Sequence, residues 1–397
     1  MFIAILGRQP EISIAELEAV YGDKNIQRVS NQAALVDCDT FAIDTLGGIT
    51  KCGYIIKRVK SQKSDHTALL QASKFITEQY TRKLAHSQKK ITFGISFYDG
   101  KANPRDIQKI GLILKKSLKK ANVSLRLIPN KTAALSTATS HNNKLGRSET
   151  KIEIIIVKAT NSDLLIAESR GTQNINSYTQ RDRGRPKRDA FVGMLPPKLA
   201  QIMINLSGAK SGDYLWDPFC GTGTVLQEAA LARINTYGSD LSDKMINYTS
   251  ENMHWLEKTF STDTFWQTFQ SDATSIKLTP EQKQQISHIV CETYLGQPFS
   301  TPPAPEKLQE VARNCNHITN SFLQNIRSQI RPDSTLCIAV PAWQNHHGQF
   351  THLPLLKNLN DLGYRQITNK NLLYYRPDQV VGREILVLKP IDIAKTA

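Results

Sequence analysis

The chain has 397 residues, of which 40% are hydrophobic and 21% are charged, a composition typical of soluble globular proteins. No run approaches eighteen apolar residues, and the apolar stretch at the N-terminus, residues 2–6, is too short for a signal peptide. Both observations argue against a membrane protein. The six cysteines show no CxxC spacing, so we expect reduced thiols in a cytoplasmic protein and no metal site.

The net charge of +15 is concentrated in one half of the chain. Residues 1–189 contain 32 Lys and Arg against 17 Asp and Glu, whereas residues 190–397 contain 18 of each. A basic half joined to a neutral half indicates one part that binds a polyanion and another with a different task. A general bias toward lysine in the source organism is the alternative explanation.

The N-terminal half predicts two small α+β units, over residues 1–62 and 63–170. FIAIL reads as a first strand, and ISIAELEAVYG has helical spacing that ends at Gly22. A helix is expected over residues 66–85, and ITFGISFYDG alternates as a strand. KIEIIIVKA followed by DLLIAESRG predicts a hairpin.

A helix is also expected from Pro104 to Lys120. Its apolar face would consist of Ile107, Ile110, Ile113, Leu114 and Leu118. Four lysines crowd its C-terminal end and are candidate RNA contacts: Lys115, Lys116, Lys119 and Lys120. Lysines at this end also offset the helix dipole, which is the alternative reading.

Residues 171–189 (GTQNINSYTQRDRGRPKRD) contain no apolar cluster and are interpreted as a basic linker. Arginine guanidinium groups match phosphates well, so five residues here are candidate RNA contacts: Arg181, Arg183, Arg185, Lys187 and Arg188. The alternative is a run that is merely solvated.

From residue 190 onward, predicted strands and helices alternate. This pattern predicts a mostly parallel sheet covered by helices on both faces. LPPKLAQIMINLSG reads as a helix with proline in its first turn and Gly208 after its end. YLWDPF, TYGSDL and ISHIVCETYL are predicted strands of this domain, which we place at residues 190–397.

The segment WDPFCGTGTVLQEAA (216–230) is the sharpest motif. A strand ends in Asp217, the chain turns through Gly221 and Gly223, and a helix begins. The third glycine of the dinucleotide fingerprint is absent, because position 226 is Leu, and the P-loop lysine is absent too.

Two more carboxylates follow at predicted strand ends, Asp240 and Asp272. Three successive carboxylates fit a ligand with a cationic amino acid, a ribose and an exocyclic amine, namely S-adenosylmethionine. The alternative is that each aspartate caps the helix after it. The cofactor site predicted from these strand ends consists of Asp217, Pro218, Cys220, Gly221, Thr222, Gly223, Asp240, Leu241, Asp272 and Ala273.

These segments resemble a known family. DPFCGTGTVLQEAA resembles motif I of RNA and DNA methyltransferases, and QRDRGRPKRDAFVGMLPPKLAQIMINLSG resembles the entry helix of the THUMP-containing tRNA guanine-N2 methyltransferases that modify position 10. GRQPEISIAELEAVYG resembles their N-terminal ferredoxin-like part, and FGISFYDG and ALSTATSHNNKL resemble their THUMP region. The resemblance implies a Rossmann-like S-adenosylmethionine domain preceded by an α+β region that binds the tRNA acceptor end.

The catalytic loop departs from that family. Its Asp/Asn-Pro-Pro-Tyr/Phe motif aligns with Glu292, Thr293, Tyr294 and Leu295, so both prolines are missing. A carboxylate can accept the N–H bonds of guanine's exocyclic amine and take up the proton, and an aromatic face can hold the base. Glu292 and Tyr294 are therefore the catalytic candidates, with Phe299 as a second stacking candidate. A degenerated site is the alternative.

The sequence thus predicts S-adenosylmethionine-dependent methylation of guanine N2 in tRNA. Methylation of another RNA or DNA base, or a tRNA-binding protein that has lost the reaction, remains open. The family also implies a small activating subunit for eukaryotic members, for which no docking surface is evident. We expect a monomer.

Overall fold

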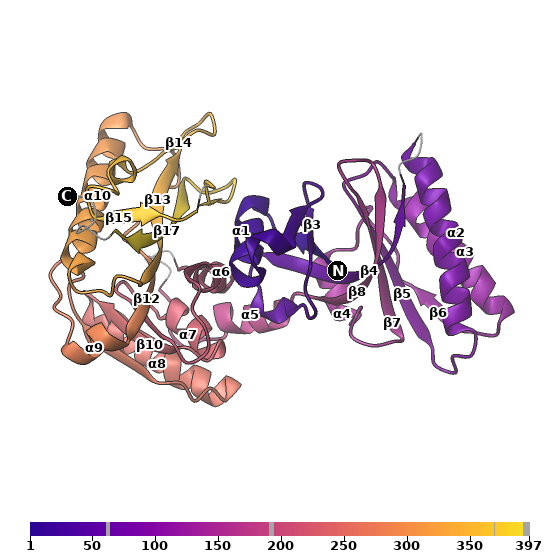
Figure 1. Cartoon of the computed structure of the whole chain (residues 1–397), viewed down its shortest axis with the longest axis horizontal. Coiled ribbons are helices and arrows are strands. Elements are labelled where there is room, and N and C mark those ends of the chain that lie inside the picture. Colours follow the sequence, from indigo (N-terminus) through magenta and orange to yellow (C-terminus); the bar gives the residue numbers. More distant parts are fainter. Residues whose placement is uncertain (61–63, 190–193, 369, 392–397) are drawn as a thin grey trace. The chain divides into compact units, whose positions relative to one another are not determined.

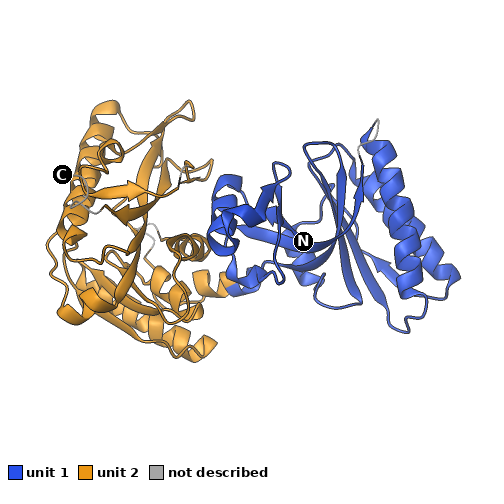
Figure 2. Ribbon diagram, in the orientation of Figure 1, with its two compact units in different colours: residues 1–177 blue, residues 178–397 orange. Residues whose placement is uncertain are grey.

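The computed structural model describes residues 1–60, 64–189, 194–368 and 370–391. It divides into two compact units, Met1–Ser177 and Tyr178–Ala397 (Figure 2). The expected domain boundaries at residues 62/63 and at residue 190 fall on positions outside the described residues. Each unit is built around its own sheet (Figure 1).

The N-terminal unit, unit 1, is one eight-stranded sheet in the order β2-β3-β1-β4-β8-β7-β5-β6. Its strands are β1 Phe2–Leu6, β2 Ile26–Arg28, β3 Ala33–Val36, β4 Ile49–Val59, β5 Ile91–Tyr98, β6 Leu125–Leu127, β7 Lys151–Lys158 and β8 Leu164–Thr172. Its helices are α1 Pro10–Tyr21, α2 Asp65–Leu84, α3 Pro104–Lys120 and α4 Thr137–Asn142, with 3-10 turns η1 Asp23–Asn25 and η2 Ile43–Thr45.

The predicted elements of unit 1 are confirmed, but residues 1–62 and 63–170 do not form separate sheets. Strand β4 from the first range pairs antiparallel with β8 from the second along most of its length. Strands β7 and β8 form the predicted hairpin. The backbone N–H and C=O groups on the β8-facing edge of β4 therefore find their partners only because both ranges share one sheet.

Helix α3 forms as expected, with Pro104 in its first turn and the Asn103 side chain accepting the Asp106 backbone N–H. Ile107, Ile110, Leu114 and Leu118 are buried in a cluster with α2 and the sheet. The inclusion of Ile113 in the apolar face is wrong, because this side chain is 50% exposed. It lies one residue from Leu114 and so turns away from the buried stripe.

The boundary between the two units, at residues 177/178, falls within the predicted linker 171–189, but this segment is folded. The segment contains the end of β8 and helix α5 Ile175–Arg183. Tyr178, Arg181 and Arg185 are buried. Composition alone does not reveal the burial of these arginines. A run of arginines suggests a solvent-exposed segment, but the long side chain of each can also reach a buried polar partner.

The C-terminal unit, unit 2, is a nine-stranded sheet whose main path runs β11-β10-β9-β12-β13-β17-β15. Its strands are β9 Tyr214–Asp217, β10 Asn235–Asp240, β11 Trp266–Gln270, β12 Ile286–Glu292, β13 Thr335–Gln344, β14 Phe350–Thr351, β15 Tyr364–Gln366, β16 Leu373–Tyr374 and β17 Val381–Pro390. Its helices are α6 Pro197–Ser207, α7 Thr224–Leu231, α8 Asp243–Phe260, α9 Pro280–Gln285 and α10 Pro305–Arg327, with the 3-10 turn η3 Pro354–Lys357.

The predicted parallel sheet is confirmed over β11, β10, β9, β12 and β13, and β17 and β15 close it antiparallel. The chain moves from β9 outward to β10 and β11 and then returns to place β12 on the other side of β9. The strand order therefore reverses between β9 and β12. In an open α/β sheet, a ligand binds outside the carboxyl ends of the strands at such a reversal.

Candidate functional site at the strand reversal

Asp217 ends strand β9 at the reversal and is 2% exposed. Its Oδ1 accepts the backbone N–H of Phe219 at 3.0 Å. Burial raises the pKa of this carboxyl well above its ordinary value, and the nearby charges of Asp240 and Glu292 raise it further. An ionised carboxylate here is therefore poorly compensated by the protein and favours a cationic ligand.

The glycines of the motif are required by backbone geometry. Gly221 and Gly223 have φ of 52° and 80°, in the left-handed region. A Cβ on Gly223 would also lie 2.8 Å from the Thr249 methyl group. The turn thus brings the backbone close to α8 and opens α7 directly after the strand, as the sequence predicts.

Asp240 ties this turn to the end of β10. Its Oδ2 accepts the Gly221 N–H at 3.0 Å, and its Oδ1 accepts the Ser242 N–H at 2.9 Å. Two backbone donors fix the carboxylate's orientation without neutralising it. Asp240 therefore has a structural role in fixing the turn, although it does not cap α8, and it is half-buried beside the glycine turn.

Asp272 differs from the other two aspartates. Its side chain is engaged locally, because its Oδ1 accepts the backbone N–H and the hydroxyl of Thr274 at 2.8 and 2.7 Å. These contacts form a local turn and not the helix cap of the alternative reading, because the next helix, α9, begins only at Pro280. Ala273 beside it is buried in the core.

Of the remaining cofactor candidates, some have buried side chains and one has an exposed side chain. Cys220, Pro218 and Thr222 are buried, and the Cys220 Sγ lies 3.8 Å from the Thr249 hydroxyl oxygen; burial raises the pKa of this thiol. Leu241, in contrast, is 69% exposed directly after β10. A large aliphatic side chain exposed at this edge offers an apolar surface to a flat ring, which fits the adenine of S-adenosylmethionine.

Glu292 ends β12, the strand beside β9. Its Oε1 accepts a hydrogen bond from Nε of Arg383 on β17, and both side chains are largely buried. Burial raises the pKa of the Glu292 carboxyl, while the Arg383 guanidinium opposes this shift. The sequence analysis missed Arg383; the signal was a single arginine in the otherwise apolar run that leads into EILVL.

The loop after Glu292 is anchored without the family's two prolines. The Thr293 backbone N–H and its hydroxyl both donate to the carbonyl of Ala339, at 2.9 and 3.2 Å, and Thr293 is 2% exposed. Gly296 has φ of 82°, and a Cβ there would lie 2.6 Å from Val311 on α10. Tyr294 between these anchors is 44% exposed, whereas Phe299 packs against the core. Tyr294 is thus the better placed aromatic face.

The basic segment holds the motif helix. Arg181 donates to Glu228 on α7 through Nε and Nη2, at 2.6 and 3.1 Å, with both residues buried. Arg185 donates to the Thr224 hydroxyl at 2.6 Å. The hypothesis that Arg181 and Arg185 contact RNA is therefore wrong, because both guanidinium groups are buried against α7.

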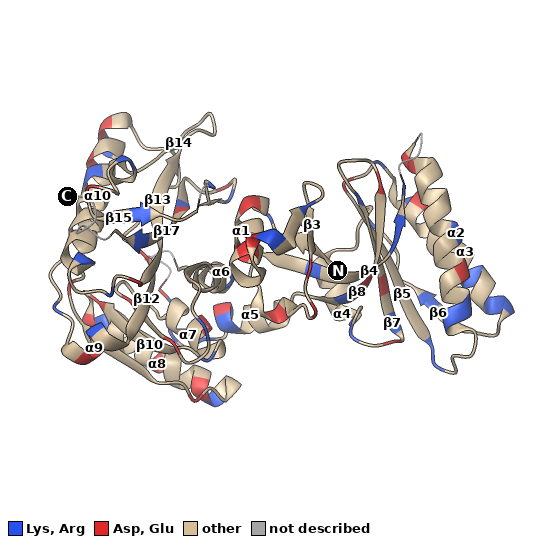
Figure 3. Cartoon of the chain, in the orientation of Figure 1, with Lys and Arg blue, Asp and Glu red and all other residues tan. Residues whose placement is uncertain are grey.

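The other basic candidates lie nearer the surface. Arg183 and Arg188 are exposed, and so are Lys115, Lys116, Lys119 and Lys120 on α3. Figure 3 marks the positions of Lys and Arg along the chain in blue. Lys187 is half-buried and pairs with Glu251 at 3.2 Å. Asn252, fully buried on α8 and missed by the sequence analysis, donates to the carbonyls of Lys187 and Thr222. It joins this segment to the glycine turn.

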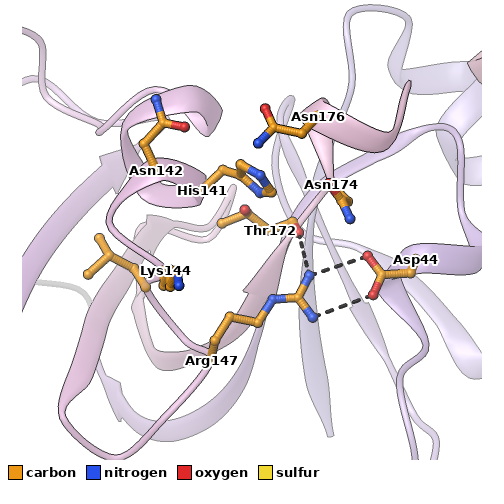
Figure 4. Close-up of a pocket in the computed structure, with 9 residues that line it drawn as sticks. Asp44, His141, Asn142, Lys144, Arg147, Thr172, Asn174 and Asn176 are labelled. Carbon is orange, nitrogen blue, oxygen red and sulfur yellow. Dashed lines mark hydrogen bonds and ion pairs between the residues drawn. The ribbon is translucent and has the colours of Figure 1, made fainter. Parts of the chain in front are cut away.

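Unit 1 contains a cavity of about 360 Å³ (Figure 4). Figure 4 shows His141, Lys144 and Arg147 around it, together with the amides of Asn142, Asn174 and Asn176. Arg147 pairs with Asp44 at 3.3 Å and donates to the Thr172 carbonyl. The lining thus contains two cations, Lys144 and the Asp44-paired Arg147, together with several hydrogen-bond donors.

Within the part of the chain that the structure describes, no group of three or more His, Cys, Asp or Glu side chains is arranged to hold a metal ion. Over the same described residues, no helix is both long and apolar enough to cross a membrane.

Two family profiles match the sequence. Residues 185–346 match a family described as an RMKL-like methyltransferase domain, and residues 54–252 match one described as a DNA methylase. The chain belongs to the methyltransferases. The first match covers the strand reversal, the glycine turn and Glu292, so the family assignment and the site geometry fall on the same part of unit 2.

Among curated proteins, the tRNA (guanine(10)-N2)-dimethyltransferase of Methanothermobacter thermautotrophicus is 34% identical over 162 residues, 40% of this chain and 43% of that relative. The protein of the same description from Methanocaldococcus jannaschii is 30% identical over 130 residues, 33% of this chain and 36% of that relative. These matches span less than half the length of either relative.

Among solved structures, TrmN from Thermus thermophilus has a TM-score of 0.55 and 15% identity, covering 98% of this chain and 99% of its own. A possible methylase from Clostridium difficile 630 has a TM-score of 0.52 and 15% identity, covering 97% of each chain. Because the sequence identity is only 15%, these structural similarities show the fold of the chain and nothing more.

The first prediction concerns Asp217. Because its folded-state pKa is raised, its contribution to stability is full below its unfolded pKa and is lost as pH rises through the folded pKa. Asp217→Asn should therefore raise the melting temperature of unit 2 at neutral pH by about 2 °C or more. It should also weaken S-adenosylmethionine binding by about tenfold to hundredfold, measured by isothermal titration.

The cofactor affinity measured by this titration should also depend on pH. Cofactor affinity of the unmodified protein should rise with pH through the raised pKa of Asp217, and this rise should be absent in Asp217→Asn. Asp263→Asn, on the surface of the same unit, is the control and should change neither property. An unchanged affinity in Asp217→Asn would remove Asp217 from the cofactor site.

The second prediction separates two arginines of one helix. Arg181→Met leaves the Glu228 carboxylate buried without its partner and should destabilise unit 2 by about 3–5 kcal/mol. Arg183→Met, two positions along and exposed, should change stability by about 0.5 kcal/mol or less. Urea denaturation of both variants measures the difference, and equal losses would show that burial of Arg181 is not what matters.

Proposed function

We propose that this protein is an S-adenosylmethionine-dependent methyltransferase that methylates the exocyclic N2 of a guanosine in tRNA, at position 10 as in the names of its curated relatives. One observation carries the proposal. A buried and poorly compensated carboxylate, Asp217, lies at the strand reversal beside a second carboxylate, Glu292. This arrangement fits a cationic cofactor next to a substrate amine.

The residues at the strand ends suit the parts of S-adenosylmethionine. Asp217 would hold the cationic amino acid part, Asp240 would accept from the ribose hydroxyls, and Leu241 would offer its apolar side chain to the adenine. Asp272 is a weaker candidate for the adenine amine because its Oδ1 is already bonded to Thr274. When bound, the cofactor supplies a methyl group already activated by the sulfonium, so the protein's main task is positioning.

The substrate part of the site consists of Glu292 and Tyr294. Glu292 accepts a hydrogen bond from the exocyclic amine, which turns the nitrogen lone pair toward the methyl carbon. S-adenosylmethionine would supply the methyl group and leave as the neutral thioether, and Glu292 would take up the proton that the amine loses. The exposed ring of Tyr294 stacks on the base and holds it flat.

We propose that unit 1 is a THUMP-containing region with a ferredoxin-like N-terminal part that binds the tRNA. The excess of positive charge in residues 1–189 supports this role. The exposed lysines of α3 and the cation-lined cavity are its candidate phosphate contacts. Arg183 and Arg188 remain candidates because their side chains are exposed, and the half-buried Lys187 remains one despite its pairing with Glu251.

The altered loop is the one feature that favours a second candidate, a tRNA-binding protein without the reaction. The loss of two prolines removes rigidity. Thr293, Gly296 and the Arg383 contact restrain the same loop by other means. These anchors support the catalytic proposal over the non-catalytic one.

The third prediction tests the reaction. Incubation with methyl-labelled S-adenosylmethionine and bulk tRNA should yield N2-methylated guanosine, located by mass spectrometry of digested tRNA. Glu292→Gln should lower kcat by about a hundredfold, because the base is lost, while cofactor affinity stays within about threefold. Glu306→Gln, an exposed glutamate at the start of α10, is the control. A Glu292→Gln variant with unchanged kcat would exclude Glu292 from the reaction.

The fourth prediction tests unit 1. Replacing Lys115, Lys116, Lys119 and Lys120 by Gln should weaken tRNA binding and reduce the dependence of log Kd on log salt concentration. The slope should fall by up to about one for each phosphate that the variant no longer neutralises. The matched control replaces four exposed lysines of unit 2, namely Lys210, Lys258, Lys277 and Lys283. Equal effects of both quadruple variants would show that charge number, not the α3 surface, governs binding.

A further inference from the structure

Arg383 is an unusual residue for its place in the fold. It lies on β17, which is separated from β12 by β13 in the sheet. Its register partner on β13 is Pro341, and Glu292 pairs with Ala339 on the other side of the same strand. The arginine side chain therefore extends across β13 to meet Glu292, while the following residues Ile385–Leu388 of β17 are buried and apolar.

Stability alone does not account for this ion pair. The Arg383 and Glu292 side chains are 9% and 13% exposed. Removing two charges from water usually costs as much as their attraction returns, and an apolar pair of similar volume is commonly as stable or more so. The pair also stands next to Asp217, whose pKa is raised in part by the charge of Glu292. This points to a role in the site.

We propose that Arg383 is a positioning and specificity-determining residue, which holds the Glu292 carboxylate as a hydrogen-bond acceptor aimed at the donor edge of guanine. An ionised carboxylate only accepts hydrogen bonds, whereas a protonated one also donates. Guanine presents donors at N1 and at the exocyclic N2, while adenine presents an acceptor at N1. An acceptor-only Glu292 thus selects guanine. This inference rests on the proposed function.

The charges that face Glu292 come from two elements. Burial favours the protonated carboxyl of Glu292, and Arg383 on β17 favours the ionised one. On β9, the charge of Glu292 in turn raises the pKa of Asp217. Without Arg383, the pKa of Glu292 rises further. A larger fraction of the carboxyl is then protonated, and a protonated carboxyl presents an O–H donor to the donor edge of guanine. This weakens guanine binding and removes the proton acceptor.

The test compares Arg383→Met, Arg383→Gln and Arg383→Lys by their pH–rate profiles for guanosine methylation. Both neutral variants should shift the acid limb to higher pH and lower the rate at pH 7 by about tenfold or more, with recovery as pH rises. Arg383→Lys keeps the charge and should leave the acid limb in place, with a smaller loss of kcat. A purely structural role would lower the rate equally at all pH values.

Folding and charge controls accompany the variants. Thermal unfolding with S-adenosylhomocysteine confirms that each variant folds, and Arg383→Gln stands in for Arg383→Met if the latter does not, because its amide still donates to Glu292. Arg331→Met removes a half-buried arginine paired with Asp333 and should keep the original profile. A folded neutral variant with the unmodified acid limb and rate overturns the proposal.

Failure of the proposed function is distinguished by a measurement that needs no turnover. Carbon-13 NMR of glutamate-labelled protein, assigned with Glu292→Gln, follows the titration of Glu292 directly. If the unmodified protein methylates no guanosine, the proposed function fails, and a Glu292 titration midpoint that rises in Arg383→Gln still supports the role of Arg383. An unchanged midpoint overturns it.

Discussion

The repulsion between buried carboxylates at the strand reversal is the constraint on which the rest of the site depends. Parallel strands β9 and β12 end side by side, so Asp217 and Glu292 are held close in a region with little water. The charge of Glu292 raises the cost of ionising Asp217. Glu292 is compensated by Arg383, while Asp217 accepts the Phe219 N–H and has no ion-pair partner among the described residues. The difference suits one carboxylate to a fixed acceptor and the other to a cationic ligand.

The surroundings of this pair hold the reacting groups still. Asp240 fixes the glycine turn, Arg181 fixes α7 through Glu228, and Thr293 fixes the loop after β12. Each of these contacts uses a polar side chain to satisfy a group that the fold buries, as a low-dielectric interior requires. A methyl donor that is already activated needs such positioning more than it needs further acid or base groups.

Much of the fold followed from periodicity, and the errors have identifiable causes. The strands and helices around residues 2–22 and 197–260 were predicted because apolar spacing, proline starts and glycine ends agree there. The solvent exposure of Ile113 was not predicted. The single sheet formed by residues 1–60 and 64–177 was not predicted either, because apolar spacing does not show which strand pairs with β4. Arg181 was taken for an RNA contact because composition does not show that Glu228 lies within its reach.

The sequence by itself determined the alternating α/β domain, the glycine turn after Asp217, the carboxylate and aromatic after β12, and the charge imbalance between the halves. These are local patterns, in which each residue's type and spacing carry the information. Only the tertiary structure decided which arginines face solvent and that Arg383, 91 residues after Glu292 in the chain, is its partner. A salt bridge between distant strands depends on sheet order, and sheet order is set by the packing of the whole domain rather than by any one segment.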